Sequence, residues 1–294
     1  MGELLTGWLK FIHRNKLFIN MLELFEYSFF QNALVSTILI SICCGLVGTY
    51  IVAKRMVFIS GGITHASFGG LGLAYYLGVS PMLGAGFFAV ASSLSILYLG
   101  DSKKFREDSL IGMFWSAGMA IGIIFIYMTP GYAPNLMTYL FGNILTVVNE
   151  HIVMLSIFTV IISIFFAIFY RPLFFIAFDK SYSKTHRINV NIVDAAMSII
   201  IALCIVICLK LAGLILVISY LTLPQAIANL YYINFKQQLV TATIISIVGS
   251  VGGLFMAALL DIPSGACIVL CFIVLFAILF GVRWITTKLN HETL

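Results

Sequence analysis

Apolar runs about as long as a bilayer is thick recur from Phe30 almost to the C-terminus of this 294-residue chain. A transmembrane helix needs about 20 predominantly apolar residues in succession. Charged residues make up only 9% of the chain, whereas soluble domains carry about 25%, so the chain lacks the charge to cover a surface in water. The sequence therefore predicts an all-α polytopic membrane protein and excludes a soluble globular fold.

Nine segments have the composition of such helices, and we expect eight to nine crossings. The segments are 30–52, 61–78, 82–99, 109–128, 151–170, 191–209, 211–231, 239–259 and 264–284. Residues 135–147 are apolar but too short to span, so they either re-enter the membrane or lie along its outer face.

Lysines and arginines gather on one side of these spans, and the loops around Pro81, Tyr132 and Pro263 carry none. The basic loops of membrane proteins face the cytoplasm, and this bias explains the net charge of +5 without a nucleic-acid partner. Nine crossings then place the N-terminus outside and the C-terminus inside. The basic set is Lys54, Arg55, Lys103, Lys104, Arg106, Arg171, Lys180, Lys184, Arg187, Lys236, Arg283 and Lys288.

We divide the chain into an N-terminal segment, 1–28, a single transmembrane domain, 29–288, and a C-terminal tail, 289–294. Apolar residues of the N-terminal segment recur at helical spacing opposite basic ones. That pattern suits a helix in the membrane interface, and a solvated tail is the alternative. Glutamates interrupt the segment and no small-residue cleavage site follows it, so we expect no cleavable signal peptide.

The six cysteines all lie in apolar spans. Cys204 with Cys208, and Cys267 with Cys271, have i, i+4 spacing, which places both thiols on one helical face as a soft-metal site would. Cysteine in such spans serves more often as a small apolar side chain. We therefore expect the six cysteines to pack in the protein core, and we expect no disulfides.

The basic segment 171–189 differs from a plain connection because it mixes Phe174, Phe175, Phe178 and Tyr182 with four cations. A turn needs few residues and no aromatic side chains. Exposed aromatic residues indicate a docking surface for another protein. The alternative is a loop folded back onto the bilayer.

Of the five histidines, only His65 falls inside a predicted span, since His151 stands at the outer boundary of the span 151–170. Ionisable groups there face the protein interior or a water-filled path, and neutral imidazole is the commonest side-chain metal ligand. Small residues on its own helix leave room for an ion or for a close helix neighbour. The glycine stripe is Gly61, Gly69 and Gly72, and the hydroxyl stripe is Ser60, Thr64 and Ser67.

Two interpretations of this segment stay open. In the first, His65, Thr64 and Ser60 line a path for a metal ion. The glycines have no side chains, so the helix backbone itself forms the adjoining wall of that path. In the second, the segment is a helix-packing motif with a hydrogen-bonded histidine. Elsewhere, Asp194 and Lys210 fall near helix ends, where polar groups reach the interface, and Gln225 follows the helix-breaking Pro224, which favours a satisfied kink over a path.

The sequence carries no enzyme signature. It contains neither an HExxH metalloprotease motif nor a GxxxxGK[ST] phosphate loop. We therefore expect a transport subunit without catalytic residues or a resident cofactor. If the protein pumps, another chain must bind the ATP.

Four stretches occur in order along the chain: KRMVFISGGITHASFGGLGLAYYLGVSP, EDSLIGMFWSAGMAIGIIF, LFGNIL and DIPSGACIVL. Together they resemble the permease family of bacterial ABC metal-ion importers, over about residues 30–285. The resemblance implies the vitamin B12-type importer fold, a homodimer, two copies of an ATPase subunit and an extracytoplasmic metal-binding protein. It also implies residence in the bacterial cytoplasmic membrane.

The resemblance further implies that residues 171–190 form the cytoplasmic ATPase-coupling loop. Phe178 and Asp179 match the family's Phe-Asp pair, and residues 183–190 follow its short helix in outline. Departures stand at Lys180, where relatives have a helix-starting proline, and at Arg187, where they often have glycine. The coupling residues implied are Phe178, Asp179, Tyr182, Lys184 and Arg187.

The departure at Gly61 bears on the metal, because many family members carry an aspartate there, one turn before the histidine. A lone imidazole binds a borderline metal weakly. On imidazole preference we expect Zn²⁺ first, Mn²⁺ second and Fe²⁺ third as the transported ion. The alternatives are a secondary transporter or channel that works without ATP and, less favoured, an intramembrane enzyme.

Overall fold

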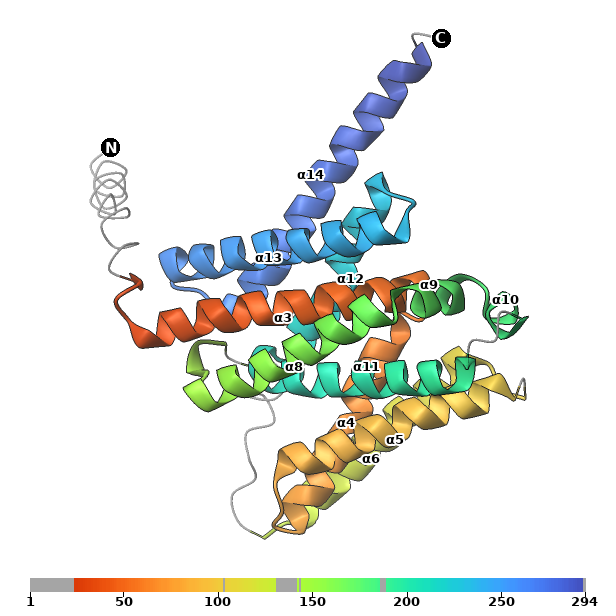
Figure 1. Ribbon diagram of the computed structural model, residues 1–294. Helices are drawn as coiled ribbons and strands as arrows, with labels where there is room; N and C mark the ends of the chain where they lie inside the picture. Colours follow the sequence, from red (N-terminus) through yellow and green to blue (C-terminus); the bar gives the residue numbers. More distant parts are fainter. Residues whose placement is uncertain (1–23, 103, 131–141, 143, 186–188, 293–294) are drawn as a thin grey trace, which may run out of the picture.

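The computed structural model describes residues 24–102, 104–130, 142, 144–185 and 189–292, and every regular element in these ranges is helical (Figure 1). Eight helices are long and apolar enough to cross a membrane. The short η2, α9 and α10 are not among them, and neither is α4, whose glycines, hydroxyls and histidine make it more polar. The elements are α3 (Ser28–Ala53), α4 (Phe58–Tyr76), α5 (Pro81–Asp101), α6 (Glu107–Met128), η2 (Ile144–Thr146), α8 (Asn149–Ile168), α9 (Tyr170–Phe178), α10 (Lys180–Thr185), α11 (Val190–Ala212), α12 (Leu214–Tyr231), α13 (Phe235–Leu260) and α14 (Ser264–Glu292).

The predicted all-α polytopic fold is confirmed, since eight of the nine predicted spans coincide with these eight helices and the ninth, 61–78, coincides with α4. Boundaries differ by a few residues, and α14 continues through Glu292, well beyond the predicted end at 284. Residues 1–23 of the predicted N-terminal segment lie outside the described residues. So does most of 135–147, of which η2 is a short 3₁₀ turn.

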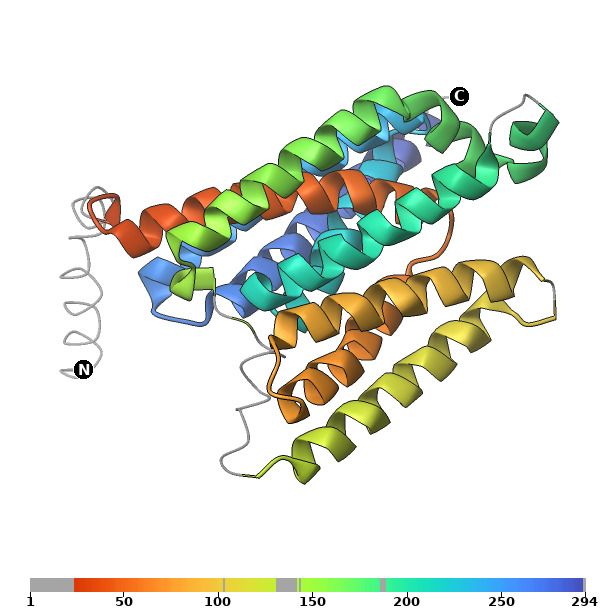
Figure 2. The ribbon, with the colours of Figure 1, turned by 60° about the horizontal axis from the view of Figure 1, so that its bottom comes forward.

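The helices form two groups that meet at α11 (Figure 2). In one group, α4 packs against α5 and α6. In the other, α3 packs against α8, α12 and α13, and α14 packs against α12 and α13. Helix α11 contacts α5 and α4 of the first group and α3 and α12 of the second. The two groups are thus joined largely through α11.

Local sequence explains several helix boundaries. Pro81 opens α5 at a position where its missing N–H is not needed. Gly213, at φ +81°, separates α11 from α12 in a conformation that a side chain would strain. Asn189 and Asn234 accept hydrogen bonds from the backbone N–H groups of Ile192 and Lys236 and so cap α11 and α13.

Pro224 lies inside α12 and cannot donate to the carbonyl of Tyr220 one turn earlier. The buried side-chain amide of Gln225 replaces that donor, with Nε2 3.1 Å from the Tyr220 oxygen and 3.0 Å from the Cys44 oxygen on α3. The carbonyl that Pro224 leaves without its helical donor is therefore satisfied, as the sequence favoured. The same amide joins α12 to α3.

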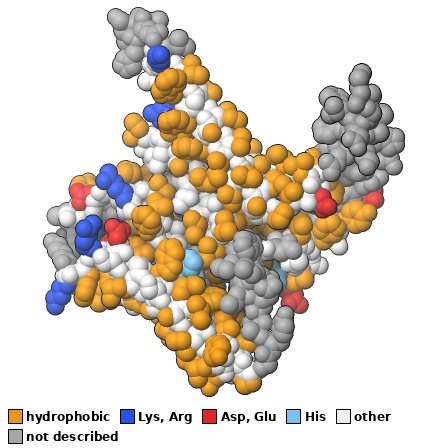
Figure 3. Space-filling view, turned by 180° about the vertical axis from the view of Figure 1, so that it is seen from behind, with side chains coloured by type: hydrophobic (Ala, Val, Ile, Leu, Met, Phe, Trp, Pro, Cys, Tyr) orange, Lys and Arg blue, Asp and Glu red, His pale blue; other side chains and the backbone are white. Residues whose placement is uncertain are grey.

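Apolar side chains cover most of the face seen in Figure 3, while lysines and arginines gather at one edge and along α14. Many large apolar residues are about half exposed, as lipid-facing side chains are. The basic edge includes the end of α3 and the start of α10, whose lysines both contact Asp194 of α11. The orientation of this edge in the membrane stays a prediction.

Candidate metal path and coupling segment

His65 lies half-buried in the middle of α4 and is held by two side chains of α6. Its ring stacks on that of Trp115, with centroids 4.1 Å apart and planes inclined by 12°. Its Nδ1 lies 3.3 Å from the Sδ of Met119, one helical turn after Trp115. The indole and the thioether therefore fix the orientation of the imidazole. The sequence did not predict these two contacts.

This clamp leaves the second nitrogen of His65 available, because within the described part of the chain Nε2 has no hydrogen bond. Neutral imidazole binds transition metals through either nitrogen. Met119 adds a soft sulfur donor beside the first nitrogen. The arrangement can thus offer one nitrogen to a passing ion, with a polarisable sulfur next to it.

The predicted path residues Ser60 and Thr64 are buried and bonded within their own helix. Ser60 Oγ donates to the Val57 carbonyl at 2.7 Å, and Thr64 Oγ1 donates to the Ser60 carbonyl at 2.5 Å. Each oxygen keeps lone pairs that could accept an ion. Their place in a metal path stays a prediction.

The three predicted glycines have two different surroundings. A Cβ on Gly69 would lie 2.9 Å from the carbonyl oxygen of Gly118, and one on Gly72 would overlap the backbone of Gly122. These two positions let α4 and α6 approach backbone to backbone, which is the packing that small residues permit in membranes.

Gly61 instead faces the indole that stacks on the histidine. A Cβ there would lie 3.3 Å from the Trp115 ring and 3.8 Å from Ile218 Cδ1 of α12. A larger residue at this position would push on Trp115 and, through it, on His65. The Trp115 indole therefore leaves no free space for a carboxylate side chain at position 61.

The predicted loop 171–189 is helical in its described part, in two pieces separated by Asp179. Helix α9 ends at Asp179, whose backbone is extended. The Asp179 side chain then helps to start α10, because its Oδ1 accepts a hydrogen bond from the Tyr182 N–H at 2.9 Å. Phe178 and Tyr182 are 56% and 44% exposed. The Phe178 ring also packs against Phe235 of α13. Aromatic side chains that are partly packed and partly exposed suit a docking surface.

Of the remaining predicted coupling residues, Arg187 lies outside the described residues, and for Lys184 only the backbone is described, within α10. The alternative in which this segment folds back onto the bilayer is not favoured, because α9 contacts α3, α8 and α11 of the helical bundle. Its buried residues Leu173 and Ile176 belong to the protein core.

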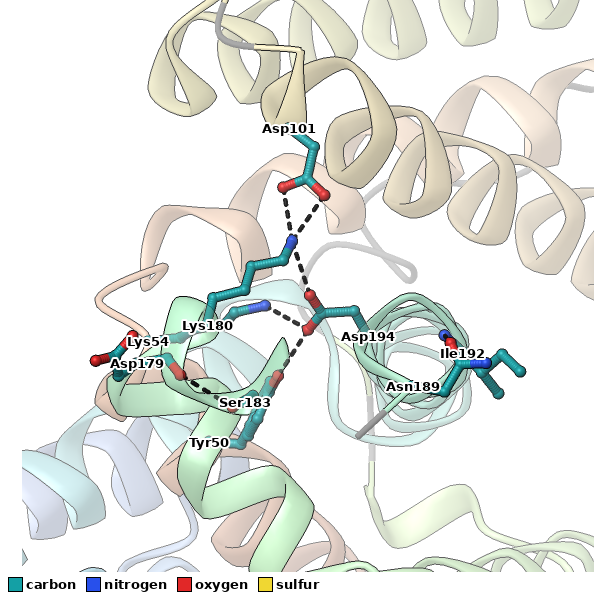
Figure 4. Close-up of polar contacts among 9 residues, drawn as sticks. All are labelled: Tyr50, Lys54, Asp101, Asp179, Lys180, Ser183, Asn189, Ile192 and Asp194. Carbon is teal, nitrogen blue, oxygen red and sulfur yellow. Dashed lines mark hydrogen bonds and ion pairs between the residues drawn. The ribbon is translucent and has the colours of Figure 1, made fainter. Parts of the chain in front are cut away.

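Sequence reasoning missed an ion-pair network at the base of α10 (Figure 4). Asp194, expected to reach the interface, is only 2% exposed, and its Oδ1 lies 2.7 Å from Lys54 Nζ and 3.1 Å from the Tyr50 hydroxyl. Lys180 Nζ lies 3.1 Å from the other carboxylate oxygen and also contacts Asp101 at the end of α5. The sequence did carry a signal for this network, because an acidic residue inside a predicted span, such as Asp194, needs a basic or hydrogen-bonding partner.

Three buried thiols, those of Cys44, Cys204 and Cys208, also come together, with sulfur atoms within 4.8 Å of one another. The i, i+4 pair on α11 thus gains a third thiol from α3, as a soft-ion site would require. All three side chains are wholly buried between the helices, where cysteine packs as a small apolar residue. Packing remains our prediction for them.

Comparison with known proteins places the chain among transporters. The family model described as the ABC 3 transport family matches residues 26–283. The chain is 31% identical over 258 residues to the manganese transport system membrane protein MntC of Halalkalibacterium halodurans, covering 88% of each chain. It is 31% identical over 266 residues to the manganese import system permease protein ScaB of Streptococcus parasanguinis, covering 90% of this chain and 95% of that one.

Among solved structures, the fold is similar to a chain of PsaBC from Streptococcus pneumoniae in complex with Fab. The TM-score is 0.78 at 28% identity, and the match covers 88% of this chain and 95% of the other. An inward-facing metal-chelate type ABC transporter shares the fold at 17% identity, with a TM-score of 0.69.

Proposed function

Because the chain belongs to the ABC 3 transport family, we propose that it is the membrane permease subunit of an ATP-driven importer that moves a divalent metal ion into the bacterial cytoplasm. The observation that carries the proposal is the family match over nearly the whole helical bundle. The half-buried imidazole of His65 inside that bundle supplies a metal-binding group where a path would need one.

We propose manganese as the first candidate for the transported ion, in place of the zinc that imidazole preference alone favoured. Two of the relatives described above carry manganese in their names. The His65 nitrogen and the Met119 sulfur, which lie next to one another, are softer ligands than the oxygen atoms that Mn²⁺ prefers. Zn²⁺ and Fe²⁺ therefore belong in the same competition assay.

The proposed assembly contains two permease copies, two ATPase subunits and an extracytoplasmic metal-binding protein. Support for the ATPase contact comes from α9 and α10, which expose Phe178 and Tyr182 near the basic edge, the edge predicted to face the cytoplasm. The chain has no phosphate loop of its own, so hydrolysis must come from the partner. The rival function is a secondary transporter or channel.

The test is uptake of radioactive Mn²⁺ into proteoliposomes that contain the chain with or without an ABC ATPase subunit from the same organism. We expect co-purification of the two proteins and uptake only when ATP and the ATPase are both present. Unlabelled Zn²⁺ and Fe²⁺ added as competitors then rank the metals. Uptake by the chain alone, driven by an ion gradient, would establish the rival function instead.

A further inference from the structure

Four charged side chains, three from the helices α5, α10 and α11 and one from the residue after α3, meet at the start of α10 (Figure 4). Lys180, the first residue of α10, contacts both oxygens of Asp101 at 2.6 and 2.7 Å and Asp194 at 3.1 Å. Lys54, just after α3, contacts the same Asp194 at 2.7 Å. Two ammonium groups thus neutralise two carboxylates, so the cluster as a whole carries no net charge.

The members of this cluster are not equally needed for folding. Asp194 is nearly inaccessible to solvent, and an unpaired charge there would be strongly unfavourable. Yet it keeps Lys54 and the Tyr50 hydroxyl as partners whether or not Lys180 is present. Asp101 is 47% exposed, so water can solvate it. Loss of Lys180 therefore leaves no buried charge without a partner.

Lys180 is itself held in its charged form. Its partial burial lowers the pKa, but the bonds and charges of Asp101 and Asp194 outweigh that effect and leave the pKa above its ordinary value. The ammonium is therefore present at physiological pH. Its position is fixed as well, because Asp179 caps the turn that begins at Lys180.

The three contacts of Lys180 connect α10 to both helix groups of the bundle. Asp194 lies one turn after Val190, the first residue of α11, and Asp101 is the last residue of α5. Helix α5 packs closely on α4, where a Cβ on Gly84 would overlap the Gly70 backbone. Helix α4 carries His65 and is clamped by α6. Contiguous rigid elements thus run from the coupling segment to the candidate metal path.

We propose that Lys180 is a positioning residue that links movement of α10 to α5 and α11, and so joins ATP hydrolysis to opening of the metal path. The proposal rests on the proposed function as an ATP-driven importer. Without the link, the ATPase still docks on Phe178 of α9 and Tyr182 of α10, but displacement of α10 no longer draws α5 along. The bundle remains assembled, because α5 and α11 also pack directly, with Ser93 Oγ 2.9 Å from the Ser198 carbonyl.

The test measures ATP hydrolysis and Mn²⁺ uptake in parallel on the complete complex in proteoliposomes. Lys180→Met keeps the length of the side chain and removes the charge. Lys180→Arg keeps the charge and can pair with both oxygens of Asp101. Lys236→Met is the matched control, since Lys236 is an exposed lysine at the cytoplasmic start of α13.

We expect Lys180→Met to assemble with the ATPase and hydrolyse ATP, while uptake per ATP hydrolysed falls about fivefold or more, as for loss of a coupling interaction. Lys180→Arg should restore the ratio. Asp101→Asn should lower it in the same direction but less, because Lys180 retains Asp194. The Lys236→Met control should match the wild type.

Two results would overturn the proposal. One is a wild-type ratio of uptake to hydrolysis in Lys180→Met. The other is loss of ATPase binding in that variant, measured by size-exclusion chromatography, because Lys180 would then serve docking or folding. Failure of the proposed function itself is distinguishable, since in that case the wild-type complex would show no ATP-dependent uptake at all.

Discussion

The close approach of α4 to α6 can be tested at Gly72 with Gly86 as the matched control. A Cβ on Gly72 would lie 2.7 Å from the Gly122 Cα, whereas one on Gly86 of α5 would meet no atom within 4 Å. Ordinary contact begins near 3.4 Å. The same Cβ would overlap the Gly122 carbonyl oxygen, which is nearer still, so an alanine at Gly72 forces the two helices apart by more than about 0.7 Å in an interior that is close-packed.

The expected effect follows from two opposing contributions. Alanine gains about 1 kcal/mol over glycine in a helix interior, and both variants share that gain. Overpacking costs about 1 to 3 kcal/mol, and only Gly72→Ala carries that cost. We therefore expect Gly72→Ala to be less stable than Gly86→Ala by about 1 to 3 kcal/mol.

The assay is unfolding of the purified protein in mixed micelles with increasing dodecyl sulfate, followed by circular dichroism. Uptake measured on the same preparations adds a functional readout, because separation of α4 from α6 also displaces Trp115 and Met119 from His65. Superimposable unfolding curves for the two variants would refute the packing argument. They would mean that α4 and α6 are not in backbone contact.

Three further predictions concern the path and the docking surface. His65→Ala should abolish metal-dependent growth under chelation while the protein still folds and binds its ATPase; normal uptake of zinc, manganese and iron would remove His65 from the path. Gly61→Asp should shift the metal preference or rate if Trp115 can give way, and a purely destabilised protein would support packing alone. Replacing both Phe178 and Tyr182 by alanine should weaken ATPase binding, since such anchors contribute about 2 kcal/mol or more each, and unchanged co-purification would contradict the docking assignment.

The existence and place of the membrane helices could be predicted from the sequence. Each apolar run is long enough by itself to require a helix in lipid, since every backbone polar group must be bonded within its own segment. The family could also be identified, because its four motifs stand in order along the chain. The apolar runs and the family motifs each consist of residues that are contiguous in the chain. They can therefore be recognised in a single sequence without knowledge of the fold.

Partners across the bundle were decided by the tertiary structure alone. His65 meets Met119 from 54 residues away, and Asp194 meets Lys54 from 140 residues away. In the segment 171–189, the resemblance implied a short helix after the Phe-Asp pair, and the structure adds α9 before that pair. No periodicity along the chain specifies which helices become neighbours, because lipid and protein are similarly apolar and close packing selects the contacts. The sequence therefore determined which segments cross the membrane, and the packing of those segments determined which side chains meet there.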